Sequence, residues 1–131
     1  MSEQNGNLLR VRVEPLGDGV SVVSLAGELD LSTLPDLEGP LFEELRTRTG
    51  VVVDLTQLIF IDSSGIGLLI KASGLRSDPA AMHIAIAPES QVERVLGLTG
   101  VDRALPVTVG SDEALAALRG RHGDRDAERT G

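Results

Sequence analysis

The chain has 131 residues with 20 acidic and 12 basic side chains, which gives a formal net charge of −8. Apolar residues make up 41% of it, enough for the core of one domain, and the absence of cysteine excludes disulfides, thiolate metal sites and a cysteine nucleophile. The acidic balance argues against nucleic acid as a partner. With no apolar leader and no uninterrupted apolar span, we expect a cytoplasmic protein without a membrane segment.

The first part of the chain predicts a strand hairpin followed by a helix. Apolar and charged residues alternate over residues 9–14, which is typical of a strand with one exposed face. A glycine-containing turn at 17–19 separates this strand from a β-branched run at 20–26. Apolar residues at helical spacing then predict a helix capped by Ser32 or Thr33. Pro40 falls inside this helix, where we expect a kink or a late, tight first turn.

The second part of the chain predicts three strands that alternate with three helices. The strands are expected at residues 51–55, 82–87 and 105–109. The first of them has no alternation, which indicates that both of its faces are covered. The helices are expected to begin near residues 63–64, at the capping box of residues 90–93, and at Ser111. The order β-β-α-β-α-β-α-β-α predicts an α/β fold with parallel crossovers.

The two ends of the chain differ in composition from the part between them. Residues 1–7 are small and polar, and residues 119–131 contain no large apolar side chain. Neither segment buries enough surface to offset the entropy of ordering. We therefore expect a flexible arm at 1–7, one domain at 8–118 and a disordered tail at 119–131.

Side chains suited to catalysis are few. Of the two histidines, His122 lies in the predicted tail and His83 inside a predicted strand, so Ser63 has no evident base for a hydrolase. The sequence has neither a dinucleotide fingerprint nor a phosphate-binding loop. A phospho-aspartate receiver needs a lysine at the end of a late strand, whereas the only lysine, Lys71, falls in a predicted helix. We predict no enzymatic activity, no catalytic residue and no cofactor.

The segment of residues 60–67 has an unusual local chemistry. Asp62, Ser63 and Ser64 are all favourable helix N-cap residues, and the nearby glycines allow close approach of the backbone. One reading is a plain helix cap. The other is a hydroxyl that accepts a phosphate, which free backbone N–H groups and the helix dipole would favour and which Asp62 would oppose. The residue chemistry alone leaves both readings open.

A second cluster of interest ends at Asp30, which follows a predicted strand and precedes a predicted helix. Asp30 either caps that helix or is solvated. Together with Asp54 and Asp62 it also raises the alternative of a metal-assisted site, because ligands gather at strand ends in α/β sheets. A structural role is the expectation for Asp54, and no metal site is predicted.

Four motifs in this order resemble the anti-sigma factor antagonist family, the stand-alone branch of the sulfate-transporter-and-anti-sigma-antagonist (STAS) domain. The motifs are Gly27–Asp30, Val51–Leu55, Phe60–Gly67 and Val95–Asp102. The resemblance covers about residues 8–118. It implies the STAS fold, a mixed sheet with its helices packed mainly on one side.

The resemblance also implies a partner switch. Unphosphorylated members bind an anti-sigma factor, a serine kinase with a histidine-kinase-like ATP-binding fold, and so release the sigma factor. The kinase then phosphorylates the antagonist, and a serine phosphatase resets it. Matching the motifs places the phosphorylated residue at Ser63 and partner-binding residues at Asp30, Asp62, Ser63, Ser64 and Gly65. We expect a monomer. The alternative is a STAS adaptor in a stress-sensing scaffold or beside a lipid-transport ATPase.

Overall fold

The computed structural model describes residues 9–130, with side chains placed for residues 9–120. Within that range the chain forms one five-stranded sheet with the strand order β1-β2-β3-β4-β5. The strands are β1 (Leu9–Pro15), β2 (Val20–Leu29), β3 (Gly50–Ile61), β4 (Met82–Ile86) and β5 (Val107–Val109). β1 pairs antiparallel with β2, and every other neighbouring pair is parallel, so the sheet is mixed as predicted.

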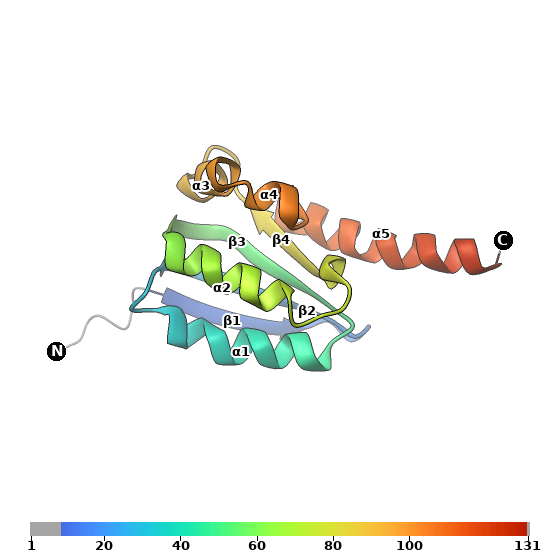
Figure 1. Ribbon diagram of the computed structural model, residues 1–131. Helices are drawn as coiled ribbons and strands as arrows, with labels where there is room; N and C mark the ends of the chain where they lie inside the picture. Colours follow the sequence, from blue (N-terminus) through green and yellow to red (C-terminus); the bar gives the residue numbers. More distant parts are fainter. Residues whose placement is uncertain (1–8, 131) are drawn as a thin grey trace.

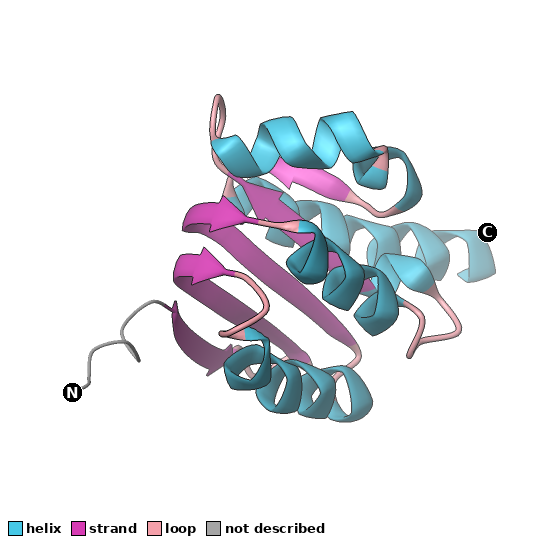
Figure 2. Cartoon of the chain, turned by 60° about the vertical axis from the view of Figure 1, so that its left-hand side comes forward, coloured by secondary structure: helices cyan, strands magenta, loops and turns pink. Residues whose placement is uncertain are grey.

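The helices cover the two faces of the sheet unequally (Figures 1 and 2). They are α1 (Leu34–Thr47), α2 (Ser63–Ser73), α3 (Gln91–Thr99), α4 (Val101–Ala104) and α5 (Ser111–Thr130), with a 3-10 turn, η2, at Pro79–Ala81. Helices α1, α2 and α3 lie on one face and α5 lies on the other. The predicted element order is confirmed, and the short α4 and η2 are additions that the sequence did not indicate.

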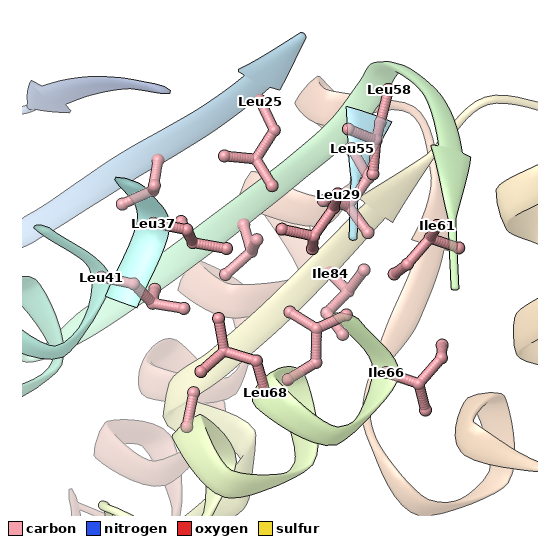
Figure 3. Packing of buried hydrophobic residues seen from close by; sticks show 14 of the residues in the cluster. Leu25, Leu29, Leu37, Leu41, Leu55, Leu58, Ile61, Ile66, Leu68 and Ile84 are labelled. Carbon is pink, nitrogen blue, oxygen red and sulfur yellow. The ribbon is translucent and has the colours of Figure 1, made fainter. Parts of the chain in front are cut away.

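Two hydrophobic clusters hold these layers together. The larger cluster joins the sheet to α1, α2 and α3, and Figure 3 shows part of it, including Leu29, Ile61 and Ile66. The smaller cluster joins the opposite face of the sheet to Ala114 and Leu118 of α5. Residues 51–53 of β3 are fully buried and alternate between the two clusters. The prediction that both faces of this strand are covered is therefore confirmed.

Strand β3 is longer than the predicted strand of residues 51–55. It continues to Ile61, and its register against β2 shifts twice, between Ser24 and Ala26 of β2 and again between Gly27 and Glu28. Each shift adds a residue to β3, so its inward side chains beyond Asp54 are Leu55, Leu58 and Ile61 instead of alternate residues. A spacing of three is not the alternation by which a strand is recognised in a sequence. The longer β3 brings the chain to the sheet edge where α2 begins.

Helix α1 runs without a break through Pro40, so the assigned helix contains the residue that was expected to disturb it. Pro40 is exposed, so its ring lies on the solvent side of the helix and not against the core. Thr33 occupies the N-cap position as predicted, but its side chain makes no cap hydrogen bond. Its hydroxyl instead donates to the carbonyl oxygen of Glu28 at 3.0 Å, because the end of β2 lies within reach.

The predicted arm at residues 1–7 lies outside the described residues. The helical range of α5 continues to Thr130, past the predicted end of the domain at residue 118, and Figure 1 shows it extending beyond the sheet. The side chains from residue 121 onward, His122 included, are outside the described part, so the division at 118 stays a prediction. No helix of the described residues is long and apolar enough to span a bilayer.

Candidate functional site

The loops that follow β2 and β3 lie against each other at the carboxyl edge of the sheet. The backbone N–H of Asp62 donates to the carbonyl oxygen of Leu29 at 3.2 Å, which joins the end of β3 to the end of β2. This contact places Asp30 and Asp62, thirty-two residues apart in the sequence, in neighbouring turns. Of the three acids that the sequence analysis considered at strand ends, Asp30 and Asp62 lie at this edge, whereas Asp54 lies within β3.

Asp62 is the N-cap of α2, and it is one of the three residues whose type the sequence analysis found suitable for that position. Its Oδ1 accepts hydrogen bonds from the backbone N–H groups of Ser64 at 2.9 Å and Gly65 at 3.1 Å, and from the Ser64 hydroxyl at 2.6 Å. The hydrogen bond from the Ser64 hydroxyl has the largest influence on the pKa of Asp62 and lowers it. Burial opposes this effect, and the backbone N–H groups of Gly65, Ser64 and Leu31 lower the pKa further. Asp62 is therefore a carboxylate at neutral pH.

The two serines after Asp62 differ in what their hydroxyls do. Ser64 is half-buried and its hydroxyl is used in the bond to Asp62. Ser63, the first residue of α2, is exposed, and its hydroxyl takes part in none of the hydrogen bonds among the described side chains. Ser63 is thus the hydroxyl of this turn that is presented to an approaching molecule.

Gly65 explains why the turn can pack so closely. A Cβ atom at this position would lie 2.8 Å from Ile61 Cγ1 and 3.0 Å from Leu29 Cγ, both of which belong to the core. Gly67, by contrast, has open space where a Cβ would point. The buried Gly65 therefore shapes the start of α2 and is not itself at the surface.

Asp30 repeats the geometry of Asp62 in the neighbouring turn. Its Oδ1 accepts from the backbone N–H of Ser32 at 3.0 Å, the Ser32 hydroxyl at 2.8 Å and the backbone N–H of Thr33 at 3.2 Å. Asp30 thus stabilises the turn that leads into α1, and the helix itself begins at Leu34. The sequence analysis offered two interpretations of Asp30, a helix cap and a solvated carboxylate. Asp30 bonds to the turn just before the helix, so the first interpretation is nearly correct and the second is wrong.

Two of the backbone N–H groups at the start of α2 are engaged by Asp62. The N–H groups of Ser64 and Gly65 already donate to the Asp62 carboxylate. The N–H groups of Ser64 and Gly65 are therefore not among the free donors that the sequence analysis considered for a phosphate. A phosphate on Ser63 would instead face a carboxylate whose charge is fixed in place.

Other residues singled out from the sequence lie elsewhere. Asp54 is within β3, where its Oδ1 accepts from the Thr56 N–H at 2.9 Å and hydroxyl at 2.7 Å beside a register shift. His83 Nε2 lies 2.9 Å from Thr108 Oγ1 between β4 and β5. Lys71 lies over the Phe42 ring of α1, 5.5 Å from its centroid. Within the described residues no group of three or more histidines and acids is placed to hold a metal ion.

Three exposed apolar side chains belong to the chain segments next to these turns. Leu31, between Asp30 and Ser32, is 73% exposed, and Ile59 near the end of β3 is 68% exposed. Phe60, two residues before Asp62, is 39% exposed. Large apolar side chains of this exposure beside a polar turn are the composition expected of a protein-binding surface.

One residue of this region was missed by the sequence reasoning. Gln91, the first residue of α3, was considered only as part of a capping box, and the Ser90–Glu93 cap is present. The Gln91 side chain, however, hydrogen bonds to the backbone of Ile61, one residue before Asp62. A glutamine at a helix start carries no sequence signal for such a contact.

Comparison with known proteins identifies relatives of this chain. The STAS_2 family model, described as "Mlab, STAS domain", matches residues 14–109. The anti-sigma-F factor antagonist RsfB of Mycobacterium tuberculosis is 30% identical over 109 residues, which span 82% of this chain and 88% of RsfB.

Solved structures give the same result. An anti-sigma factor antagonist from Mycobacterium paratuberculosis superposes with a TM-score of 0.77 at 30% identity, covering 85% of this chain and 94% of that one. The Bacillus cell fate determinant SpoIIAA, solved in its phosphorylated form, has a TM-score of 0.60 at 20% identity, covers 83% of this chain and 99% of its own, and shares the fold. The chain therefore belongs to the STAS-domain family, among relatives named anti-sigma factor antagonists.

Proposed function

We propose that this protein is an anti-sigma factor antagonist that is switched by phosphorylation of Ser63. The observation that carries the proposal is the exposed Ser63 hydroxyl, held on a turn in which the Ser64 hydroxyl and the Ser64 and Gly65 N–H groups are hydrogen bonded to Asp62. The two mycobacterial relatives named above, each 30% identical to this chain, support the antagonist role. The protein acts in this proposal as the substrate of a kinase and as a binding partner, not as an enzyme.

The unphosphorylated protein binds an anti-sigma factor that is itself a serine kinase. The binding surface is centred on Ser63 and includes the Asp30 and Asp62 turns, with Leu31 as an exposed apolar side chain between them. Ser64 and Gly65 take part indirectly, because Ser64 completes the cap and Gly65 is buried against Leu29 and Ile61. Binding releases the sigma factor from the kinase.

The kinase then modifies the antagonist. Ser63 Oγ attacks the γ-phosphorus of ATP, the bond from that phosphorus to the bridging oxygen breaks, ADP leaves, and the hydroxyl proton passes to a base of the kinase. A serine phosphatase reverses the change by hydrolysis.

The phosphate ends the complex by electrostatics and bulk. It adds a charge of about −1.5 to −2 at neutral pH. Asp62 already occupies the N–H donors of Ser64 and Gly65, so these two groups are not available to the new charge. Burying an uncompensated charge in an interface costs about 2–5 kcal/mol, which is sufficient to dissociate a complex of moderate affinity. The domain itself needs no refolding.

A second candidate is a STAS adaptor in a complex that does not control transcription. The observation that favours it is the matching family model, whose description names Mlab. An adaptor would keep the fold and the surface but would bind its partner regardless of the state of Ser63.

A paired capture experiment separates the two functions. Ser63→Ala and Ser63→Asp proteins are used as baits in lysate of the source organism, and bound proteins are identified by mass spectrometry. The antagonist role predicts that the alanine bait retains a serine kinase of the anti-sigma type and that the aspartate bait loses it. Retention of the same non-kinase proteins by both baits would contradict the antagonist role and favour the adaptor.

A further inference from the structure

We propose that Gln91 is a positioning residue for Ser63, holding the end of β3 from the neighbouring helix α3. The inference rests on the proposed function only where phosphorylation is concerned, because the contact and its mechanical effect belong to the fold. It assigns a role in the switch to a residue outside the Asp62–Gly65 turn.

The contact consists of two hydrogen bonds between one side-chain amide and one backbone residue. The Ile61 N–H donates to Gln91 Oε1 at 3.0 Å, and Gln91 Nε2 donates to the Ile61 carbonyl oxygen at 3.0 Å. Both distances are those of well-formed bonds. The amide therefore satisfies the donor and the acceptor of Ile61 at once, as the backbone of an adjacent strand would.

The need for this contact follows from the sheet. β4 pairs with β3 only over Val51–Asp54, opposite Met82–Ala85, and β4 ends at Ile86. β3 continues for seven more residues, to Ile61. Buried backbone groups without partners are costly, so the strand end on this side requires a substitute for β4. Gln91 supplies it at the last residue of the strand.

Gln91 is itself held firmly. The Ser90 hydroxyl oxygen accepts from the Glu93 N–H at 3.0 Å, and the Ser90 hydroxyl donates to the Ala87 carbonyl oxygen at 2.7 Å. The Glu93 carboxylate accepts from the Glu89 N–H at 2.7 Å. These bonds fix the start of α3, so the Gln91 amide holds Ile61 from a rigid position.

Ile61 passes this restraint to the turn. Its side chain is buried in the core and lies against Gly65, where an added Cβ would approach Ile61 Cγ1 to 2.8 Å. Ile61 is thus restrained through its backbone by Gln91 and through its side chain by the start of α2. Ser63 lies between Ile61 and Gly65 in the sequence, so its hydroxyl is positioned by residues that are fixed on both sides.

The test uses amide hydrogen exchange by NMR on the full chain. Gln91→Met removes both bonds at similar side-chain length, Gln91→Glu keeps only the acceptor for the Ile61 N–H, and Gln57→Met makes the same change at an exposed position of β3. We expect Gln91→Met to speed exchange of the Ile61 amide by about tenfold, as loss of one hydrogen bond predicts. The Ser64 and Gly65 amides should follow by about threefold, with Gln91→Glu intermediate and Gln57→Met unchanged.

Three exchange results would overturn the proposal. The first is an unchanged Ile61 amide in Gln91→Met, and the second is a response confined to Ile61, because the restraint then does not reach the turn. Faster exchange throughout the β2–β3 ladder would mean general destabilisation, which also overturns a positioning role. These outcomes are independent of any kinase.

A kinetic measurement examines the consequence for phosphorylation, with the kinase captured by the Ser63→Ala bait. For Gln91→Met we expect a fall in kcat of about fivefold with KM within about twofold of wild type, because the exposed surface is unchanged while the hydroxyl is less well positioned. An unchanged kcat would overturn the proposal. Absence of Ser63 phosphorylation in the wild-type protein would instead refute the proposed function, and the exchange results alone would then decide the role of Gln91.

Discussion

The Asp30 and Asp62 turns are built alike and differ at the position that faces solvent. In each, one carboxylate oxygen accepts from the N–H and the hydroxyl of the serine two residues on, and from the N–H of the third residue. The residue in between, whose side chain the turn does not use, is Leu31 in one and Ser63 in the other. The two turns therefore share one backbone arrangement. The position that the turn does not use, here called the free position, holds an apolar side chain at Leu31 and a phosphorylatable hydroxyl at Ser63.

The third residue of each turn differs for a structural reason. Thr33 is buried and its hydroxyl donates to the Glu28 carbonyl oxygen, whereas Gly65 meets Leu29 and Ile61 where a side chain would begin. The Asp62 turn is thus pressed against the core and the Asp30 turn is held by an extra hydrogen bond. The difference predicts which substitutions each turn tolerates.

The largest effect is expected at Gly65. Gly65→Ala should lower the free energy of unfolding by about 1–3 kcal/mol, because the methyl group overpacks the contact with Ile61 and Leu29. Gly67→Ala is the matched control in the same helix, where open space allows a gain of up to about 1 kcal/mol from helix propensity. Urea unfolding of the two variants measures both changes. Equal effects would show that the turn is not pressed against the core.

Removing the carboxylates should have the next largest effect. Asp62→Ala is expected to cost about 0.5–2 kcal/mol through loss of the α2 cap, and Asp30→Ala less, since Asp30 closes a turn before α1. Urea unfolding at neutral pH checks the order. A larger loss for Asp30→Ala would contradict the assignment of Asp62 as the cap.

The pH dependence of stability distinguishes Asp62 further. The pKa of Asp62 is lowered in the folded protein from an ordinary value of 3.8, so its contribution is present above that value and is lost as pH falls through the folded pKa. The stability difference between wild type and Asp62→Asn should therefore shrink below a pH of about 4. Unfolding curves from neutral to acidic pH measure it, and a difference that stayed constant would contradict the lowered pKa.

The smallest effects on stability are expected at the free positions. Ser63→Ala and Leu31→Ala should each change the free energy of unfolding by less than about 0.5 kcal/mol, because both side chains are exposed. The effect of Leu31→Ala should appear in binding, because loss of an apolar interface residue should weaken the complex with the captured kinase by about tenfold. Unchanged affinity, measured by calorimetry, would exclude Leu31 from the interface.

Much of this arrangement follows from sequence patterns. The element order, the mixed sheet and the Asp62 cap could all be predicted, because periodicity and cap residues act locally. The end of β3 could not, since two register shifts give Leu55, Leu58 and Ile61 a spacing of three that is usual in helices. The Gln91 contact joins residues 30 apart, and only the fold brings them together. The sequence also could not predict that the N–H groups of Ser64 and Gly65 are hydrogen bonded, because this depends on the direction in which the Asp62 carboxylate points.

The most direct test of the central claim is to locate the phosphate. Wild-type, Ser63→Ala and Ser64→Ala proteins are incubated with the captured kinase and ATP, and the peptide that spans the turn is sequenced by tandem mass spectrometry. We predict acid-stable phosphate on Ser63 in wild type and in Ser64→Ala, and none in Ser63→Ala. Phosphate on Ser64, or undiminished phosphorylation of Ser63→Ala, would contradict the account.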